Sequence, residues 1–165
     1  MTLLYFVLIL LCLVALYSLA NGAIYVPTDK RSVEIIVQSL NVRPGMRVAD
    51  LGSGDGRIVI ALAMAGANAV GFENNPVLFV WSWIKIRRLG LNQRAKIYWR
   101  SFWRQDLSPF DAVVVFGMSH IMLRLQRKLN KELRPDALII SNVFKFPNWQ
   151  PVGEVGMIKI YRIGG

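Results

Sequence analysis

Apolar positions recur along this chain with two periods, one typical of strands and one typical of helices. Strands are predicted at 47–51, 69–73, 95–99, 112–116, 137–141 and 157–163. Helices are predicted at 30–40, 55–65, 76–89 and 120–133. Strands that alternate with helices predict a parallel α/β sheet. Pro147 and Pro151 leave no room for a regular helix before the last strand, so we expect six strands, or seven with a very short sixth.

A stretch near the N-terminus departs from both periods. Residues 3–20 carry no charge, and the apolar run extended to Val26 is long enough to cross a hydrocarbon core of about 30 Å as a helix. A cleaved signal peptide would show Lys or Arg before the run, and a buried core helix would show a polar face. Neither feature is present. We therefore expect a transmembrane anchor over 1–26 and a folded domain over 27–165.

The charges that flank this run predict its orientation. No charged side chain precedes Asp29, whereas Lys30, Arg31 and Arg43 follow it. Positive residues stay on the cytoplasmic side, so we expect a single-pass membrane protein with its N-terminus outside and its domain in the cytoplasm. The chain has a single cysteine, Cys12, which lies inside the run. Because one cysteine has no partner in the chain, an intrachain disulfide and a cysteine metal cluster are excluded. No metal site is predicted.

A glycine-rich turn, Asp50–Arg57, follows the strand at 47–51 and opens a helix. A strand, a turn of this kind and a helix N-terminus form a site for a nucleotide-like ligand. Asp50 and Asp55 would repel a pyrophosphate and attract a ligand with an amino group and a sulfonium, and Arg57 stands where the dinucleotide fingerprint needs glycine. The pattern resembles the first motif of class I S-adenosylmethionine-dependent methyltransferases. The turn residues expected to bind this cofactor are Asp50, Gly52, Ser53, Gly54, Asp55 and Gly56.

An acid at the end of the second domain strand supports the same ligand. Glu73 lies about 20 residues after the turn, where doubly wound folds place the carboxylate that binds ribose hydroxyls. Asn75 can cap the helix that follows, and Pro76 suits its first position.

The balance of charge is strongly basic, with a formal net charge of +10. Such a charge suits nucleic acid or an anionic membrane surface. One group of bases lies on a single face of the helix at 120–133, opposite an apolar stripe: Arg124, Arg127, Lys128 and Lys131. This basic row is either a solvated face or, beside an anchor, a face directed toward lipid headgroups.

Several further motifs resemble one family, the membrane-anchored lysine methyltransferases of the mitochondrial ATP synthase c-subunit and adenine nucleotide translocase. The motifs are GAIYVPT (22–28), RIVI (57–60), GFENNP (71–76), VFG (115–117), KL and EL (128–129 and 132–133) and FKFPNW (144–149). The resemblance implies a Rossmann-like class I methyltransferase sheet with a shortened C-terminal part and an N-terminal transmembrane helix. It implies S-adenosyl-L-methionine as cofactor and a lysine of an integral membrane protein as methyl acceptor. It adds Asn74, Ser101, Phe102 and Gly117 to the expected cofactor-binding residues.

The chain departs from the family pattern at three positions. Ser101 stands where the family has an acid that faces the adenine amino group. Val143 replaces an Arg, and Lys145 stands where Pro is usual. These changes fall on the expected substrate side, so they bear on the target more than on methyl transfer.

No side chain is a clear catalytic base. Transfer from a sulfonium requires mainly positioning and exclusion of water, but a lysine acceptor must first lose a proton. Aromatic residues could form a slot for an ammonium through cation–π contact, or could belong to the core. The candidates for catalytic or slot residues are Tyr25, Thr28, His120, Phe144, Phe146 and Trp149.

Other functions remain open from the sequence. A nucleic-acid methyltransferase would suit the basic charge, but enzymes that methylate exocyclic base amines carry Asn/Asp-Pro-Pro-aromatic where this chain has Phe116–Ser119. We therefore expect no nucleic-acid partner. Methylation of a small molecule or lipid is a further alternative. A non-catalytic, membrane-tethered module that binds S-adenosylmethionine is another.

Overall fold

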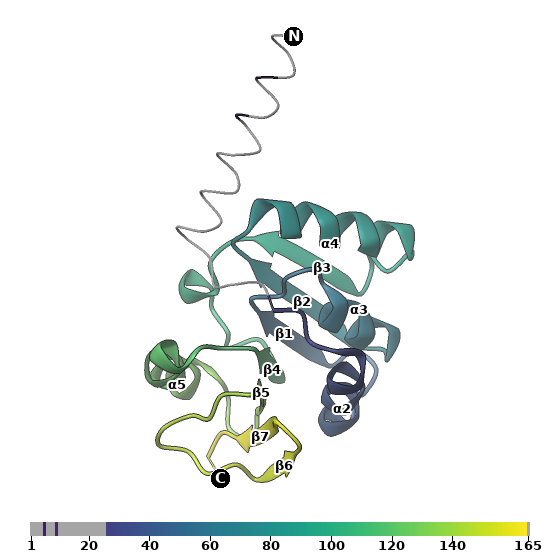
Figure 1. Ribbon diagram of the computed structural model, residues 1–165. Helices are drawn as coiled ribbons and strands as arrows, with labels where there is room; N and C mark the ends of the chain where they lie inside the picture. Colours follow the sequence, from purple (N-terminus) through teal and green to yellow (C-terminus); the bar gives the residue numbers. More distant parts are fainter. Residues whose placement is uncertain (1–4, 6–8, 10–25, 165) are drawn as a thin grey trace.

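The fold is a seven-stranded sheet with helices on both faces (Figure 1). The computed structural model describes Tyr5, Ile9 and residues 26–164. The helices are α2 (Lys30–Leu40), α3 (Arg57–Met64), α4 (Pro76–Arg88), the 3-10 helix η1 (Phe102–Arg104) and α5 (Ser119–Glu132). The strands are β1 (Arg47–Leu51), β2 (Asn68–Glu73), β3 (Ala95–Trp99), β4 (Ala112–Val115), β5 (Leu138–Asn142), β6 (Gly153–Val155) and β7 (Ile158–Arg162).

The strand order is β3-β2-β1-β4-β5-β7-β6. The first five strands are parallel, whereas β7 runs antiparallel to both β5 and β6. The predicted parallel sheet is therefore correct for these five and wrong for the last two. The alternative of a very short sixth strand is confirmed, since β6 has three residues. Between β5 and β6 the chain is described throughout and contains no helix, as the prolines there predicted.

The expected transmembrane segment over 1–26 falls almost entirely outside the described residues. Within the part of the chain that the structure does describe, no helix has the length and apolar character needed to cross a bilayer.

Two apolar cores lie on opposite faces of the sheet. Helices α2, α3 and α4 cover one face, and α5 with the segments around 102–110 and 144–149 covers the other (Figure 1). Alternate residues of β1 enter the two cores: Val48 packs beneath the three helices, while Ala49 and Leu51 face α5. Each central strand is thus buried on both faces, which explains its nearly continuous run of apolar residues.

The site is positioned by the point at which the strand order reverses. β1 pairs with β2 on one side and β4 on the other, with Asp50 beside Gly71 and Val114. The connections from β1 and β4 leave toward opposite faces of the sheet, so a crevice opens at the carboxyl ends of these strands.

A close approach between the glycine-rich turn and α4 fixes that crevice. Gly56 is the N-cap of α3 and has a φ of 79°. A Cβ at this position would lie 2.8 Å from the Cβ of Ser82, which is fully buried in α4. Only glycine satisfies both the left-handed conformation and the contact.

Substitution of Gly56 by Ala should therefore cost more than the same substitution at a glycine with open space. We expect a loss of about 2–4 kcal/mol in the free energy of unfolding, from left-handed strain plus overpacking. Gly45 is the matched control, because its φ is 80° and no atom of the described residues lies within 4 Å of an added Cβ. Gly45→Ala should cost about 1–2 kcal/mol. Equal losses in urea denaturation would contradict the packing argument.

Candidate functional site

A cavity of about 270 Å³ opens at the carboxyl ends of β1, β2 and β4. Its walls are the segment 26–28, the glycine-rich turn, the end of β2 with the start of α4, the region of η1, and the residues that follow β4. Of the residues predicted to bind a cofactor, the cavity is lined by Asp50, Gly52, Ser53, Gly54, Asp55, Glu73, Asn74, Phe102 and Gly117.

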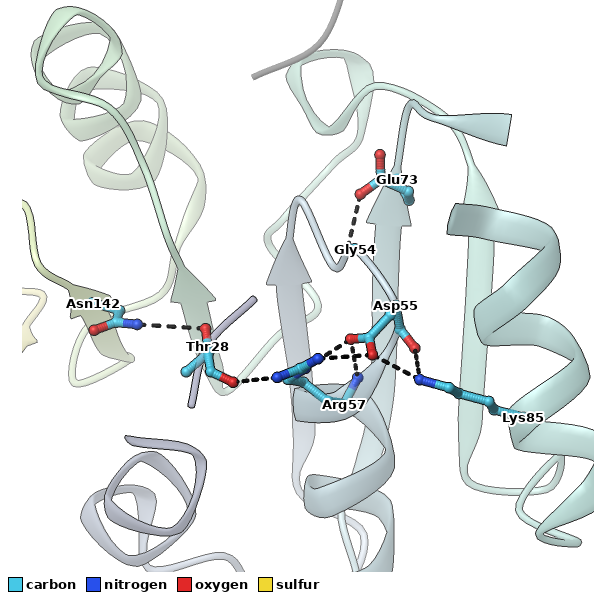
Figure 2. Close-up of polar contacts among 7 residues, drawn as sticks. All are labelled: Thr28, Gly54, Asp55, Arg57, Glu73, Lys85 and Asn142. Carbon is cyan, nitrogen blue, oxygen red and sulfur yellow. Dashed lines mark hydrogen bonds and ion pairs between the residues drawn. The ribbon is translucent and has the colours of Figure 1, made fainter. Parts of the chain in front are cut away.

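Glu73 is held in this wall by backbone donors (Figure 2). The Gly54 amide donates to Oε2 at 2.8 Å, and the Asn75 amide donates to Oε1 at 2.6 Å. The carboxylate therefore links the end of β2 to the middle of the glycine-rich turn. Each oxygen retains a lone pair that can accept a further hydrogen bond from a ligand.

Asp50 presents an unsatisfied carboxyl group at the base of the cavity. It is 3 % exposed, and among the described residues its Oδ2 has no hydrogen-bond partner. Burial, together with the negative charges of Glu73 and Asp55, raises the pKa of Asp50 to about 8. A buried carboxyl in this state strongly favours a cationic ligand, which would restore its ordinary ionisation.

Asp55 has a different environment from the one predicted. Its carboxylate accepts from Arg57 Nε at 2.9 Å and from Lys85 Nζ at 2.7 Å (Figure 2). Although burial raises the pKa of Asp55, the hydrogen bonds and charges of these two cations lower it to about 2. The cofactor-binding role of Asp55 stays a prediction: the residue lines the cavity, but Arg57 and Lys85 already compensate its charge, and it ties the turn to α3 and α4.

The segment 26–28 is held across the cavity by two polar contacts. Arg57 Nη1 donates to the carbonyl oxygen of Thr28 at 2.6 Å, and Asn142 Nδ2 donates to the Thr28 hydroxyl at 3.4 Å (Figure 2). Thr28 is buried and lines the cavity. Sequence reasoning missed Asn142, which ends β5, because nothing in its neighbourhood marks it as functional. Arg57 entered the sequence analysis in the rejection of a dinucleotide motif and in the family motif RIVI (57–60), without a role in the site.

The aromatic slot predicted from 144–149 is not at this cavity. Phe146 is 2 % exposed and packs against Trp149 and Tyr161, with ring centroids 4.9 and 5.1 Å apart. Phe144 and Trp149 pack against the same core. The interpretation of these rings as core residues is therefore the correct one. Phe116, missed by the prediction, does line the cavity, and its ring centroid lies 6.2 Å from that of Phe144.

Three other predicted residues of the described part of the chain, Gly56, His120 and Ser101, do not contribute to the cavity wall. His120 is exposed at the start of α5 and lies outside the lining that the described residues form. Ser101 also lies outside that lining, whereas its neighbours Arg100 and Phe102 belong to it. Tyr25 lies outside the described residues.

The predicted basic row on α5 is interrupted. Lys128 Nζ donates to Glu132 and to the carbonyl oxygen of Gln105, both at 2.7 Å. Arg124 is exposed, but its guanidinium lies 4.2 Å from the ring centroid of Trp103, which is a wall of the cavity. The other two bases of the row, Arg127 and Lys131, are exposed.

The acids and other possible ligands of the cavity do not form a metal centre. Among the described residues, no three or more His, Cys, Asp or Glu side chains lie together in a group that could hold a metal ion.

Comparison with known proteins identifies similar sequences. The family model for the ANTKMT methyltransferase domain matches residues 50–153. The ATP synthase c-subunit lysine N-methyltransferase of Homo sapiens is 40 % identical over 84 % of this chain and 64 % of its own length. The Xenopus laevis protein of that name is 39 % identical over 92 % of this chain and 73 % of its own length. A protein-lysine N-methyltransferase of Saccharolobus islandicus is 33 % identical over 77 % of this chain and 80 % of its own length.

Solved structures share the fold. An RNA methyltransferase from Salinibacter ruber, in complex with S-adenosyl-L-homocysteine, has a TM-score of 0.78 and 28 % identity. The match covers 84 % of this chain and 92 % of that one. Coclaurine N-methyltransferase superposes with a TM-score of 0.58 at 16 % identity, which is a likeness of fold alone.

The raised pKa of Asp50 predicts a pH dependence of stability in the ligand-free protein. The folded-state pKa of about 8 lies above the ordinary value of 3.8, so the folded protein binds a proton that the unfolded chain has already released. Stability from this group therefore falls as the pH rises between these two values and is constant above them. Asp50→Asn removes the effect. Between about pH 5 and pH 9, the free energy of unfolding of the natural protein should fall by about 2–4 kcal/mol relative to that of the variant.

Denaturation at the two pH values measures this difference. Asp136→Asn is the control, because Asp136 is exposed and should leave the pH dependence unchanged. Parallel stability curves for the natural protein and Asp50→Asn would show that the Asp50 carboxyl is solvated rather than buried.

Proposed function

This chain belongs to the ANTKMT methyltransferase family, and we propose that it transfers a methyl group from S-adenosylmethionine to a lysine side chain of an integral membrane protein. Its sheet is the class I methyltransferase sheet, and S-adenosylmethionine is its cofactor. The chain spans 64 % of the human relative's length. The acceptor, the membrane location and the residue roles given below are parts of the proposal.

The observation that carries the proposal is the pair of carboxylates at the crevice. Asp50 is buried, and one of its oxygens has no hydrogen-bond partner among the described residues. Glu73 accepts from two backbone amides, and its oxygens keep lone pairs that can accept from a ligand. We assign the ammonium of the methionine part to Asp50 and the ribose hydroxyls to Glu73. Asn74 and the rings of Phe102 and Trp103, whose centroids lie 4.7 Å apart, supply the wall for the adenine. The residues present therefore fit the cofactor.

The bound cofactor supplies an activated methyl group, so the protein has to orient the acceptor and exclude water. Thr28 and Phe116 line the same cavity as Glu73, from the end of the 26–28 segment and from the residue that follows β4. The Thr28 hydroxyl oxygen accepts from Asn142 and keeps a second lone pair that can accept from the N–H of an incoming amine, which leaves the lone pair of the amine free to attack the methyl group. All three acids of the cavity have other roles, so the acceptor lysine loses its proton to solvent before it enters.

The nature of the acceptor is inferred from two sources. The curated relatives are named for the ATP synthase c-subunit and adenine nucleotide translocase as substrates. The uncharged run at 3–20 leads directly into the 26–28 segment that walls the cavity. We infer that residues 1–26 span a membrane with the N-terminus outside, and that the domain is held on the cytoplasmic side within reach of membrane proteins.

A second candidate function rests on a specific resemblance. The structural neighbour from Salinibacter ruber is described as an RNA methyltransferase, and this chain has a net charge of +10. The absence of an Asn/Asp-Pro-Pro-aromatic motif from the sequence after β4 argues against exocyclic base amines as acceptors. Mapping of the transferred methyl group separates RNA from protein.

Loss of the ribose carboxylate should weaken cofactor binding. Glu73→Ala removes charge-assisted hydrogen bonds and should reduce the free energy of S-adenosylmethionine binding by about 1–3 kcal/mol. Isothermal titration calorimetry measures the change. Glu154→Ala, in a surface ion pair with Lys145, is the matched control and should bind normally. Unaltered affinity in Glu73→Ala would refute the assignment of this residue.

The acceptor can be identified directly. Membranes depleted of the enzyme are incubated with the full-length protein and methyl-labelled cofactor, and the label is mapped by mass spectrometry. We expect it on a lysine near the membrane surface, within the reach of a short connector, about 20–30 Å. Label confined to RNA, lipid or free metabolites would reject the lysine acceptor and leave the cofactor site intact.

The orientation of the chain is tested separately. Reporter fusions at the C-terminus should be active only when the domain is in the cytoplasm, as the bases after residue 29 predict. Protease added outside intact cells should leave the domain uncut. Cleavage of the domain from outside would overturn the proposed topology.

A further inference from the structure

Helix α4 exposes large apolar side chains outside the cavity. Val77, Val80, Trp81 and Trp83 are 43–57 % exposed, and the adjoining bases Arg87 and Arg88 are exposed as well. These six residues, here named the α4 face, occupy one side of the helix at i, i+3, i+4 and i+7 spacings. The opposite side carries Ser82, which is buried against Gly56, and Ile86, which is buried in the core. The exposed half of α4 has no covering in the described structure.

Charge around this face has one sign. No Asp or Glu occurs between Glu73 and Asp106, whereas seven bases do: Lys85, Arg87, Arg88, Arg94, Lys96, Arg100 and Arg104. Lys85 is engaged with Asp55, but Arg87 lies 4.3 Å from the ring centroid of Trp83, on the exposed side. The neighbouring edge strand β3 adds exposed Trp99 and Arg100. The segment thus combines exposed indoles, aliphatic side chains and an excess of positive charge.

An anionic bilayer surface matches this combination best. Indoles partition to the level of the headgroups, aliphatic side chains enter just below, and arginines pair with anionic lipid phosphates. RNA would use the bases and the rings but would gain nothing from Val77 and Val80. A second copy of the chain, packed face to face, would place like charges opposite one another.

The path of the chain places the same surface beside the proposed anchor. Val26, where the continuous described chain begins, lines the same cavity as Asn75 and Leu78 at the start of α4. The run at 3–20, which has no charge, precedes it. This step rests on the proposed anchor, whereas the composition of the α4 face does not.

We propose that the α4 face lies on the surface of an anionic membrane, with Trp81 and Trp83 in the interfacial layer, and that it thereby fixes the orientation of the cavity relative to the bilayer. The basic row on α5 does not do this, because two of its four bases are engaged with Glu132 and Trp103. An anchor alone would leave the domain free to rotate about its connector. Contact along α4 removes that freedom.

The test uses the full-length chain in vesicles that contain brominated lipids, which quench tryptophan fluorescence at short range. Vesicles of phosphatidylcholine with and without phosphatidylglycerol are compared. We expect quenching in the anionic vesicles, and loss of most of it in the double variant Trp81→Phe/Trp83→Phe. Trp149→Phe is the matched control, because Trp149 packs against the core near β7, and it should retain the quenching.

Two double variants that remove bases test the electrostatic contribution to the contact between the α4 face and the membrane. Arg87→Gln/Arg88→Gln should reduce quenching in anionic vesicles to the level seen in neutral ones, whereas Arg127→Gln/Lys131→Gln on α5 should not. A chain that floats with vesicles while Trp81 and Trp83 remain unquenched would overturn this proposal and leave the anchor standing. A chain that floats with neither vesicle would overturn both. Quenching by added RNA in place of lipid would assign the face to nucleic acid.

Discussion

The carboxylate of Asp55 holds together the parts of the molecule that form the cavity. Through Arg57 it fixes the start of α3, and Arg57 in turn holds the carbonyl of Thr28. Through Lys85 it fixes the middle of α4. Removal of this acid would leave two cations facing each other beside a turn that already contains three glycines with positive φ. Because both cations are partly exposed, the cluster contributes to geometry more than to overall stability.

The compensation of Asp55 also explains why Asp50 can remain uncompensated. Three acids lie within one crevice, and each has a different environment: Asp55 has two cations, Glu73 has two backbone amides, and Asp50 has an unsatisfied oxygen. Since Arg57 and Lys85 are directed toward Asp55, neither of these two cations forms an ion pair with Asp50. The fold thus leaves one buried carboxyl group unpaired, which a cationic ligand would ionise and pair with, and the ligand-free protein loses stability as the pH rises.

Sequence was a good guide where a pattern has one structural solution. The bounds of β1 and β3 match the prediction, and Asn75 caps α4 by accepting from the amides of Val77 and Leu78. Sequence was a poor guide to the contacts of side chains that can point either into the cavity or toward another part of the protein. An acid in a glycine-rich turn can face the ligand or the next helix, and spacing does not show which. Likewise, Phe146 could line a slot or enter the core, and its contact with Tyr161 depends on β7, a strand that was predicted at 157–163 but whose antiparallel direction was not.

The position of α4 at the edge of the sheet bears on the interpretation of the α4 face. This helix covers the edge of the sheet, since among the described strands β3 pairs only with β2. An exposed edge strand invites unwanted pairing, and exposed lysine or arginine is a common protection. Lys96 and Arg100 provide that protection at β3, but no such explanation covers Trp81 or Trp83 on the helix. Exposed indoles of this number are costly in water and favourable at a membrane interface. The edge of the sheet beside the cavity mouth is therefore the side of the domain whose composition suits contact with lipid.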